Sequence, residues 1–234
     1  MPSYYYGFDI YYIVLILPAI LISLWAQVRV SSTFNKYSKV YSNRGMTGAQ
    51  AARKVLEMNG IYDVSIEPVA GNLTDHFDPK SNTIRLSENV YSSTSVAAIG
   101  VAAHEAGHAV QNDCDYTPMR IRSVIIPVTR IGSYLSWPLI LLGLTLNFEV
   151  LATFGIVLFG AVVAFQLVTL PVEYNASRRA INALRETGSL TSDEIPGAKR
   201  VLGAAAMTYL ASLLMAVMQM LRLILLFGGH RRRD

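Results

Sequence analysis

The sequence is poor in charge and in cysteine, and several common catalytic patterns are missing from it. Only 15% of its 234 residues are charged, and its one cysteine, Cys114, precludes an intramolecular disulfide, which favours a reducing, cytoplasmic setting. No Gly-rich loop joins a strand to a helix and no serine lies in a nucleophile-elbow motif, so P-loop nucleotide binding and serine-hydrolase chemistry are not expected. The net charge of +4 is attributed to membrane topology and anionic lipid headgroups, and no nucleic-acid partner is predicted.

Long apolar runs are what the sequence has in excess, since 52% of its residues are hydrophobic. Four runs are long enough to cross a lipid bilayer: 9–28, 121–146, 150–172 and 201–227. The first has no basic segment before it and no small-residue cleavage site after it, which favours a retained anchor over a cleaved signal peptide. Residues 147–149 alone join the second and third runs and predict a tight helical hairpin. The expected fold class is a mainly α membrane protein with about four transmembrane helices.

The segment 96–113, VAAIGVAAHEAGHAVQND, places His104, Glu105 and His108 in an Ala-rich stretch that has the pattern of a helix. At 3.6 residues per turn the two histidines stack on one face, where both imidazoles can reach a single ion. The glutamate between them can lie beside a metal-bound water as general base. This is the HExxH arrangement of zinc hydrolases. The small residues around the motif predict that this helix is buried, where unpaired His and Glu side chains would be costly. The alternative, that these residues lie on a polar helix face without a function, is therefore disfavoured.

The polar region between the first and second apolar runs has the pattern of a short α+β module. Thr47 and Gln50 form a capping-box start for a helix over 48–59, which Gly60 ends. Residues 64–68 and 83–86 predict two short strands before the HExxH helix. The expected domains are an N-terminal transmembrane anchor (1–29), a zincin-like module (30–120), a transmembrane hairpin (121–172), a helical segment (173–200), and a C-terminal transmembrane helix with a basic tail (201–234).

Basic residues near the ends of the apolar runs gather on one side of a four-span arrangement. They are Arg29, Lys36, Lys39, Arg44, Arg120, Arg122, Arg178, Arg179, Arg185, Lys199 and Arg200. The amino terminus and the hairpin tip have no Lys or Arg, so the positive-inside rule places the HExxH module in the cytoplasm. The basic tail, His230 to Arg233, conflicts with this assignment, because four spans place it on the opposite, outer side of the membrane. The last run therefore either spans against a weak local bias, re-enters the membrane or lies in its interface.

The HExxH motif requires a third ligand, because catalytic zinc usually has three protein ligands and one open position for water. The extended motif with a third histidine would have Gly at 111 and His at 114, where this chain has Gln111 and Cys114. Without the glycine turn the helix has no evident way to fold back and present Cys114. Glu173 is the better candidate, at the end of the third run, where a polar helix that stops at Gly188 is expected. A plain membrane-surface glutamate is the alternative.

The motifs HEAGHAVQ and LPVEYNASRRA, with the amino-terminal span and the late apolar hairpin, resemble the YugP-type membrane zinc metallopeptidases of bacteria over nearly the whole chain. More distantly, the segment from Glu173 to Ser177 is similar to the E-x-x-A-D element of the HtpX heat-shock proteases and the CAAX prenyl proteases. The resemblance implies a zinc-ligand role for Glu173 and a bacterial cell-membrane location. Ser177 stands where those relatives have an acid that orients a zinc-bound histidine, so either Ser177 or another carboxylate is expected to make that contact.

Three further residues are candidates for contacts with a substrate or transition state: His76, Asn72 and Arg178. The resemblance suggests an edge strand that lines the cleft, with His76 or Asn72 near the scissile carbonyl; a histidine that only caps a turn is the equal alternative. Arg178 or Arg179 could hold a peptide carboxylate or the developing oxyanion, although a solvated, lipid-facing charge cluster is the more usual role of such a pair.

The sequence therefore predicts a zinc-dependent membrane endopeptidase, a gluzincin with one Zn²⁺ per chain. His104, His108 and Glu173 are the expected ligands, and Glu105 is the general base that activates water against peptide bonds of membrane or membrane-proximal substrates. Two other classes stay open. One is a non-catalytic membrane protein with a regulatory or structural role, in which Cys114 or His76 closes the zinc site. The other is a pore or lipid-binding protein in which the polar helix is incidental.

Overall fold

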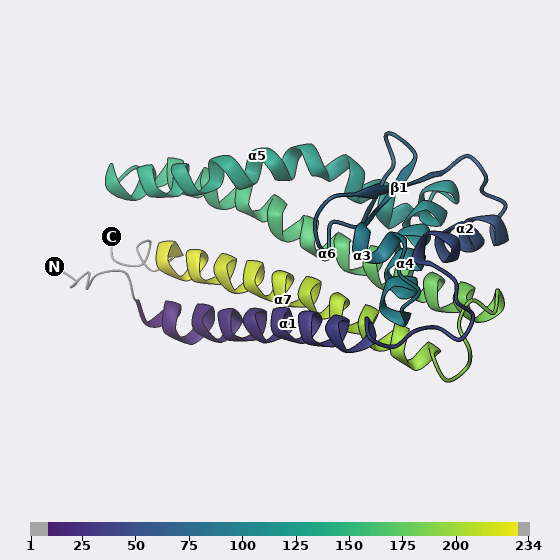
Figure 1. Cartoon of the computed structure of the whole chain (residues 1–234). Helices are drawn as coiled ribbons and strands as arrows, with labels where there is room; N and C mark the ends of the chain where they lie inside the picture. Colours follow the sequence, from purple (N-terminus) through teal and green to yellow (C-terminus); the bar gives the residue numbers. More distant parts are fainter. Residues whose placement is uncertain (1–8, 229–234) are drawn as a thin grey trace. The chain divides into compact units, whose positions relative to one another are not determined.

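The computed structural model describes residues 9–228, which are mostly helical (Figure 1). They fold into two compact units. The HExxH unit comprises residues 27–120 and 171–207, and the membrane-helix unit comprises 9–26, 121–170 and 208–228. The predicted basic tail, His230 to Arg233, lies outside the described residues. The elements in order are η1 (Tyr12–Ile16), α1 (Leu17–Tyr37), α2 (Gly48–Met58), β1 (Ser65–Val69), β2 (His76–Asp78), β3 (Thr83–Ser87), α3 (Glu88–Tyr91), α4 (Val96–Asp113), α5 (Thr117–Thr145), α6 (Glu149–Glu186) and α7 (Ile195–Gly228).

Four of the described helices are long and apolar enough to cross a membrane, judged by length and composition. They are Tyr12–Tyr37, Thr117–Thr145, Glu149–Glu186 and Ile195–Phe227. Together with a small sheet this confirms the predicted fold class, a mainly α membrane protein with a small α+β module.

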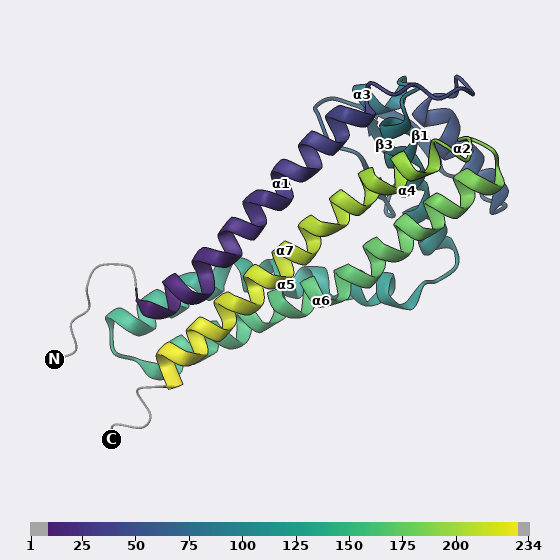
Figure 2. The ribbon, with the colours of Figure 1, turned by 90° about the horizontal axis from the view of Figure 1, so that it is seen from below.

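Within the membrane-helix unit, α5 and α6 are joined by a short turn (Figure 2). Asn147 in this turn has a left-handed backbone conformation, with φ of 48°, and the Phe148 amide donates to the Gly143 carbonyl at 2.8 Å. A Cβ atom on Gly143 would lie 2.7 Å from the Cβ of Ala152, so only glycine permits the helices to come this close. The hairpin thus has the tight geometry that the short connection predicts.

The sheet of the HExxH unit has the strand order β1-β3-β2, in which β1 runs parallel and β2 antiparallel to β3. The strands predicted over 64–68 and 83–86 correspond to β1 and β3, whereas the residue pattern predicts no strand at β2. His76 is the first residue of β2 and pairs with Arg85. A three-residue strand is too short to show alternation of polar and apolar residues, which explains the omission. β2 lies at one edge of the sheet and packs against α4.

Helix α2 begins and ends as its sequence predicts. The Thr47 hydroxyl accepts a hydrogen bond from the Gln50 amide, and the Gln50 side chain accepts one from the Thr47 amide, which together form the expected capping box. After the last helical residue, Gly60 adopts a φ of 75°, a conformation that glycine reaches at little cost.

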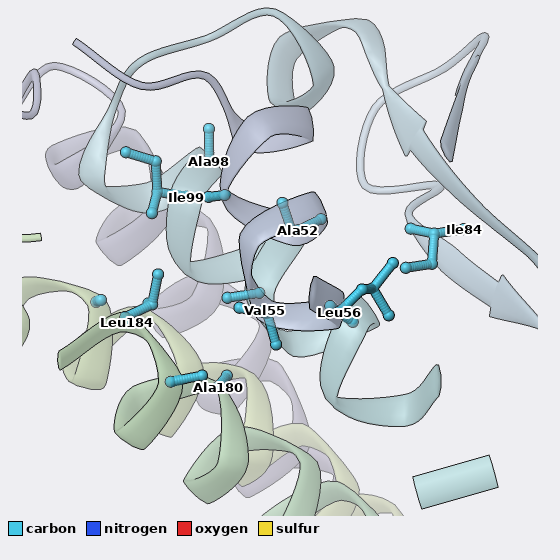
Figure 3. Close-up of a cluster of buried hydrophobic side chains, with 14 of the residues drawn as sticks. Ala52, Val55, Leu56, Ile84, Ala98, Ile99, Ala180 and Leu184 are labelled. Atoms are coloured by element: carbon cyan, nitrogen blue, oxygen red, sulfur yellow. The ribbon is translucent and has the colours of Figure 1, made fainter. Parts of the chain in front are cut away.

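One apolar cluster joins α2, β3, α4 and the C-terminal part of α6 (Figure 3). Leu56 of α2, Ile84 of β3, Ile99 of α4 and Leu184 of α6 are completely buried in it. Burial of each such side chain contributes roughly 1.5–3 kcal/mol relative to its exposed state. The cluster therefore fixes α4, which carries the HExxH motif, against the part of α6 that follows residue 170.

The backbones of α4 and α6 approach each other at Gly107. A Cβ atom on Gly107 would lie 2.7 Å from the carbonyl oxygen of Ala176 and 3.3 Å from its Cα. A side chain of any size at this position would force the helices apart. Gly107 therefore sets the spacing at which the HExxH residues of α4 face residues 173–177 of α6.

We expect Gly107→Ala to lower the free energy of unfolding by about 1–3 kcal/mol, because the added methyl group meets a backbone carbonyl that cannot yield locally. The matched control is Gly203→Ala in α7, where a Cβ would have nothing within 4 Å. That change should be neutral or stabilise the chain by up to about 1 kcal/mol through helix propensity. Denaturant unfolding of the full chain in detergent measures both, and equal stabilisation by the two substitutions would contradict the close approach.

Candidate zinc site

Side chains from two helices meet at the HExxH motif. Glu173 Oε2 of α6 lies 3.3 Å from His104 Nε2 and 3.5 Å from His108 Nε2 of α4. The nitrogen and oxygen atoms that these three residues offer to a metal all lie within 4.8 Å of one another. The two imidazoles stand edge to face, with ring centroids 4.6 Å apart. Glu173 is 65 or more positions from either histidine along the chain. The fold thus brings together the three residues that are predicted to share an ion.

The spacing of this group suits a tetrahedral zinc ion. Histidine nitrogen and carboxylate oxygen ligands lie about 2.0–2.1 Å from zinc, so two ligands of a tetrahedral ion are about 3.4 Å apart. The two distances from Glu173 Oε2 to the imidazole nitrogens, 3.3 and 3.5 Å, match this value. Glu173 and His108 are buried, and His104 is half-buried. The donor set, two imidazoles and one carboxylate, therefore suits zinc in its chemistry, and both distances from the carboxylate suit a tetrahedral ion.

The second nitrogen of each histidine contacts a neighbouring polar side chain. His104 Nδ1 is 3.1 Å from the Ser177 hydroxyl, one turn after Glu173 on α6. His108 Nδ1 is 3.0 Å from Gln111 Oε1, one turn further along α4. A proton on Nδ1 leaves Nε2 with its lone pair, so these contacts orient both rings with Nε2 towards Glu173.

The electrostatics of the group favour a cation. Burial alone would lower the pKa of His108, but the hydrogen bond and charge of Glu173 and the charge of Glu105 outweigh it and raise that pKa above its ordinary value. Two buried carboxylates thus create a negative potential at the imidazoles. The same potential would favour a divalent metal ion, which on binding would take the place of the proton on the ring nitrogens.

The other predicted site residues lie apart from this group. Cys114 follows the last residue of α4, is exposed, and contacts Arg179 Nη2 through its sulfur at 3.4 Å. His76 is exposed on β2, and its Nδ1 lies 2.7 Å from the Thr74 carbonyl, which is the turn contact that the sequence offers as an alternative. Neither residue belongs to the metal-binding group found within residues 9–228.

Asn72 and Arg178, the remaining candidates for substrate contacts, are both exposed. Asn72 Oδ1 accepts a hydrogen bond from the Asn89 side chain, which ties the loop before β2 to α3. Arg179, by contrast, is half-buried and donates through Nε to Asn175 Oδ1 at 2.8 Å. Arg179 therefore has a side-chain partner on its own helix, one turn before it, whereas Arg178 is exposed.

Sequence reasoning misses two polar residues beside the group, Gln111 and Asn175. Gln111 is completely buried, and its side chain joins His108 to Asn175 and to the Val172 carbonyl. A sequence signal for Gln111 does exist: it lies three residues after His108, one helical turn away on the same face. The contact between Asn175 and Gln111 has no such signal, because the two residues are 64 positions apart.

We expect Ser177→Ala to raise the dissociation constant for zinc about tenfold, since it removes the contact that orients His104. Ser177→Asp should bind zinc at least as tightly as the wild-type chain, because a carboxylate accepts the Nδ1 proton more strongly. Chelator competition on the purified full chain measures both. Ser92→Ala is the control: Ser92 is an exposed serine, remote from Ser177 in sequence, whose hydroxyl donates to the Glu88 carbonyl at 3.3 Å. Equal affinities of wild type and Ser177→Ala would show that the contact does not support binding.

Comparison with known proteins agrees with this site. The sequence pattern of the family described as "Putative neutral zinc metallopeptidase" matches residues 12–228. A relative, "Putative membrane protease YugP" of Bacillus subtilis (strain 168), is 46% identical over 220 residues, which cover 94% of this chain and 98% of the relative. No solved structure matches the chain. Because the family pattern and the relative both extend over nearly the whole sequence, this chain belongs to the YugP-type zinc metallopeptidase family.

Proposed function

We propose that the protein is a zinc-dependent endopeptidase in which His104, His108 and Glu173 hold one zinc ion and Glu105 is the general base. The observation that carries this proposal is the convergence of three donor atoms, within 4.8 Å of one another, from an HExxH helix and a second helix. Catalytic zinc sites characteristically combine three protein ligands with one position open to water.

Each residue has a distinct task in the proposed reaction. Bound zinc lowers the pKa of a water molecule and polarises the peptide carbonyl. Glu105 is buried and follows His104 directly on α4, and its negative charge contributes to the raised pKa of His108, which supports a role for its carboxylate beside the reacting water. It accepts the proton of the attacking water and then donates that proton to the leaving amine nitrogen.

The three-donor set favours catalysis over a structural zinc site. A structural site is closed by four protein ligands, and the sequence offers only Cys114 and His76 as a fourth. The Cys114 sulfur contacts Arg179 and the Gln111 carbonyl, and His76 Nδ1 contacts the Thr74 carbonyl. Cys114 and His76 thus make contacts outside the group formed by His104, His108 and Glu173. This supports a coordination position that is open to water.

The edge strand β2 is the proposed binding place for a peptide substrate. It pairs with β3 on one side and packs against α4, the helix that carries Glu105. An extended peptide can add to such an edge through backbone hydrogen bonds. His76 and Asn72, at and before this strand, would then lie along the bound peptide, and Arg178 remains a candidate for a contact near its end.

The substrate class follows from where Glu173 lies along the chain. α6 is a single helix that begins with an apolar run and carries Glu173 immediately after it. A zinc ligand at the end of a span draws the reaction towards the headgroup level, so we propose membrane proteins or membrane-proximal peptides as substrates. The basic residues that flank the runs support a cytoplasmic active site in a bacterial cell membrane.

We expect Glu105→Gln to abolish peptide hydrolysis, with a loss of at least about a hundredfold, because the amide cannot accept a proton from water. Zinc content should stay at one ion per chain, since Glu105 is not a ligand. A chelator-sensitive cleavage assay and metal analysis measure the two properties on the same preparation. Hydrolysis by Glu105→Gln at the wild-type rate would refute the general-base assignment.

We expect Glu173→Ala to weaken zinc binding by about ten- to a hundredfold or more, because two imidazoles and extra water replace a three-ligand set. Helix content by circular dichroism should be unchanged. Glu149→Ala is the matched control, since Glu149 is the first residue of the same helix α6. A full equivalent of zinc with unchanged affinity in Glu173→Ala, and its loss in Cys114→Ala or His76→Ala, would overturn the ligand assignment.

A further inference from the structure

A chain of three polar side chains leads from the candidate zinc site to the surface of α6. His108 Nδ1 lies 3.0 Å from Gln111 Oε1, and Gln111 Nε2 lies 3.0 Å from Asn175 Oδ1 and 2.8 Å from the Val172 carbonyl. Asn175 Oδ1 also accepts from Arg179 Nε at 2.8 Å. We call Gln111, Asn175 and Arg179 the amide network. Gln111 and Asn175 are buried, so the three contacts of the Gln111 side chain are shielded from water, whereas the contact of Arg179 is partly exposed.

The orientation of every amide in this network is fixed by groups that have only one hydrogen-bonding role. The Val172 carbonyl can only accept, so the Gln111 atom that faces it is the donor nitrogen. A guanidinium can only donate, so the Asn175 atom that faces Arg179 is the oxygen, which again leaves the Gln111 nitrogen as donor. The Gln111 oxygen must then face His108, and an amide oxygen accepts a proton and never supplies one.

We propose that Gln111 is a positioning residue that holds His108 as its Nδ1–H tautomer and so presents Nε2 to the metal. The inference rests on the proposed function, because it concerns a ligand of the proposed zinc ion. The His108 proton on Nδ1 has only the Gln111 oxygen to go to at 3.0 Å, and Nε2 is the ring atom on the side of Glu173 Oε2. The amide network makes this arrangement rigid, because a rotation of the Gln111 amide would place its nitrogen against His108 and its oxygen against two acceptors.

Gln111 could instead serve only to hold α4 against α6. A pair of substitutions distinguishes this structural role from the proposed positioning of the His108 ring. Gln111→Glu keeps an acceptor for the His108 Nδ1 proton but removes both donor contacts, to Val172 and to Asn175. Gln111→Met removes the acceptor and the donors together. If Gln111 positions the imidazole, zinc binding should survive in the glutamate variant and fail in the methionine variant. If it only holds the helices together, the glutamate variant should be at least as damaged, because its carboxylate faces the Val172 and Asn175 oxygens.

The first measurement uses the zinc-loaded wild-type chain labelled with ¹⁵N in its histidines, of which there are only four. Long-range ¹H–¹⁵N spectra distinguish a protonated Nδ1 from a protonated Nε2, and His108→Asn assigns the signal. We expect the His108 ring to show a protonated Nδ1 and a metal-bound Nε2. A metal-bound Nδ1 would overturn the inference without any substitution at Gln111.

The second measurement is the zinc dissociation constant by chelator competition. We expect Gln111→Met to raise it about ten- to a hundredfold, the usual effect of removing the partner of a metal-bound histidine. Gln111→Glu should stay within about threefold of the wild type, although its thermal stability falls. Asn112→Leu, on the exposed face of α4 beside Gln111, is the control and should match the wild type.

The outcomes distinguish this inference from the function on which it rests. A wild-type chain without zinc would overturn both. Zinc bound equally tightly by wild type and Gln111→Met, with an unchanged His108 spectrum, would overturn the positioning role alone. That role is also wrong if Gln111→Glu loses as much zinc affinity as Gln111→Met, or if neither variant folds while the wild-type ring binds metal through Nδ1. Rescue by glutamate with Nδ1 protonated supports it.

Discussion

The close packing of α4 on the later part of α6 is the contact on which the candidate site depends. Gly107 lets the two backbones approach at Ala176, and the apolar cluster around Ile99 and Leu184 holds them there. One helix contributes two imidazoles and the other contributes a carboxylate, so neither helix has a metal site alone. Any change in their spacing moves Glu173 relative to both histidines. The energy that supports the site is therefore mostly apolar burial, and the polar groups refine its geometry.

The two histidines are supported in different ways. His104 contacts a half-buried serine hydroxyl of α6, and His108 contacts a completely buried glutamine of its own helix α4. The first contact depends on the packing of the two helices, whereas the second lies within α4 and is reinforced across the interface by Asn175 and Val172. Because the Gln111 side chain contacts both His108 and α6, it links the candidate site to the packing of its helices.

The continuity of α6 gives the proposed peptidase its relation to the membrane. A helix that begins as an apolar run carries Glu173 just past residue 170, and Pro171 lies inside it without ending it. In the proposed site this ligand is adjacent in sequence to the apolar run of its own helix. The proposal of membrane-proximal substrates rests on this covalent arrangement.

The sequence by itself determined the elements whose signals are local. The apolar runs gave four candidate spans, the capping box and Gly60 gave the limits of α2, and the i, i+4 spacing placed His104 and His108 on one face of α4, because helix periodicity and bilayer thickness act over short stretches. β2 escaped prediction, since a three-residue strand exists only through its pairing with β3. Only the tertiary structure decided how Glu173, Ser177 and Asn175 meet α4, and that Gln111 is buried there rather than exposed to solvent. The contacts between α4 and α6 join residues more than 60 positions apart through side-chain packing, which no local pattern encodes.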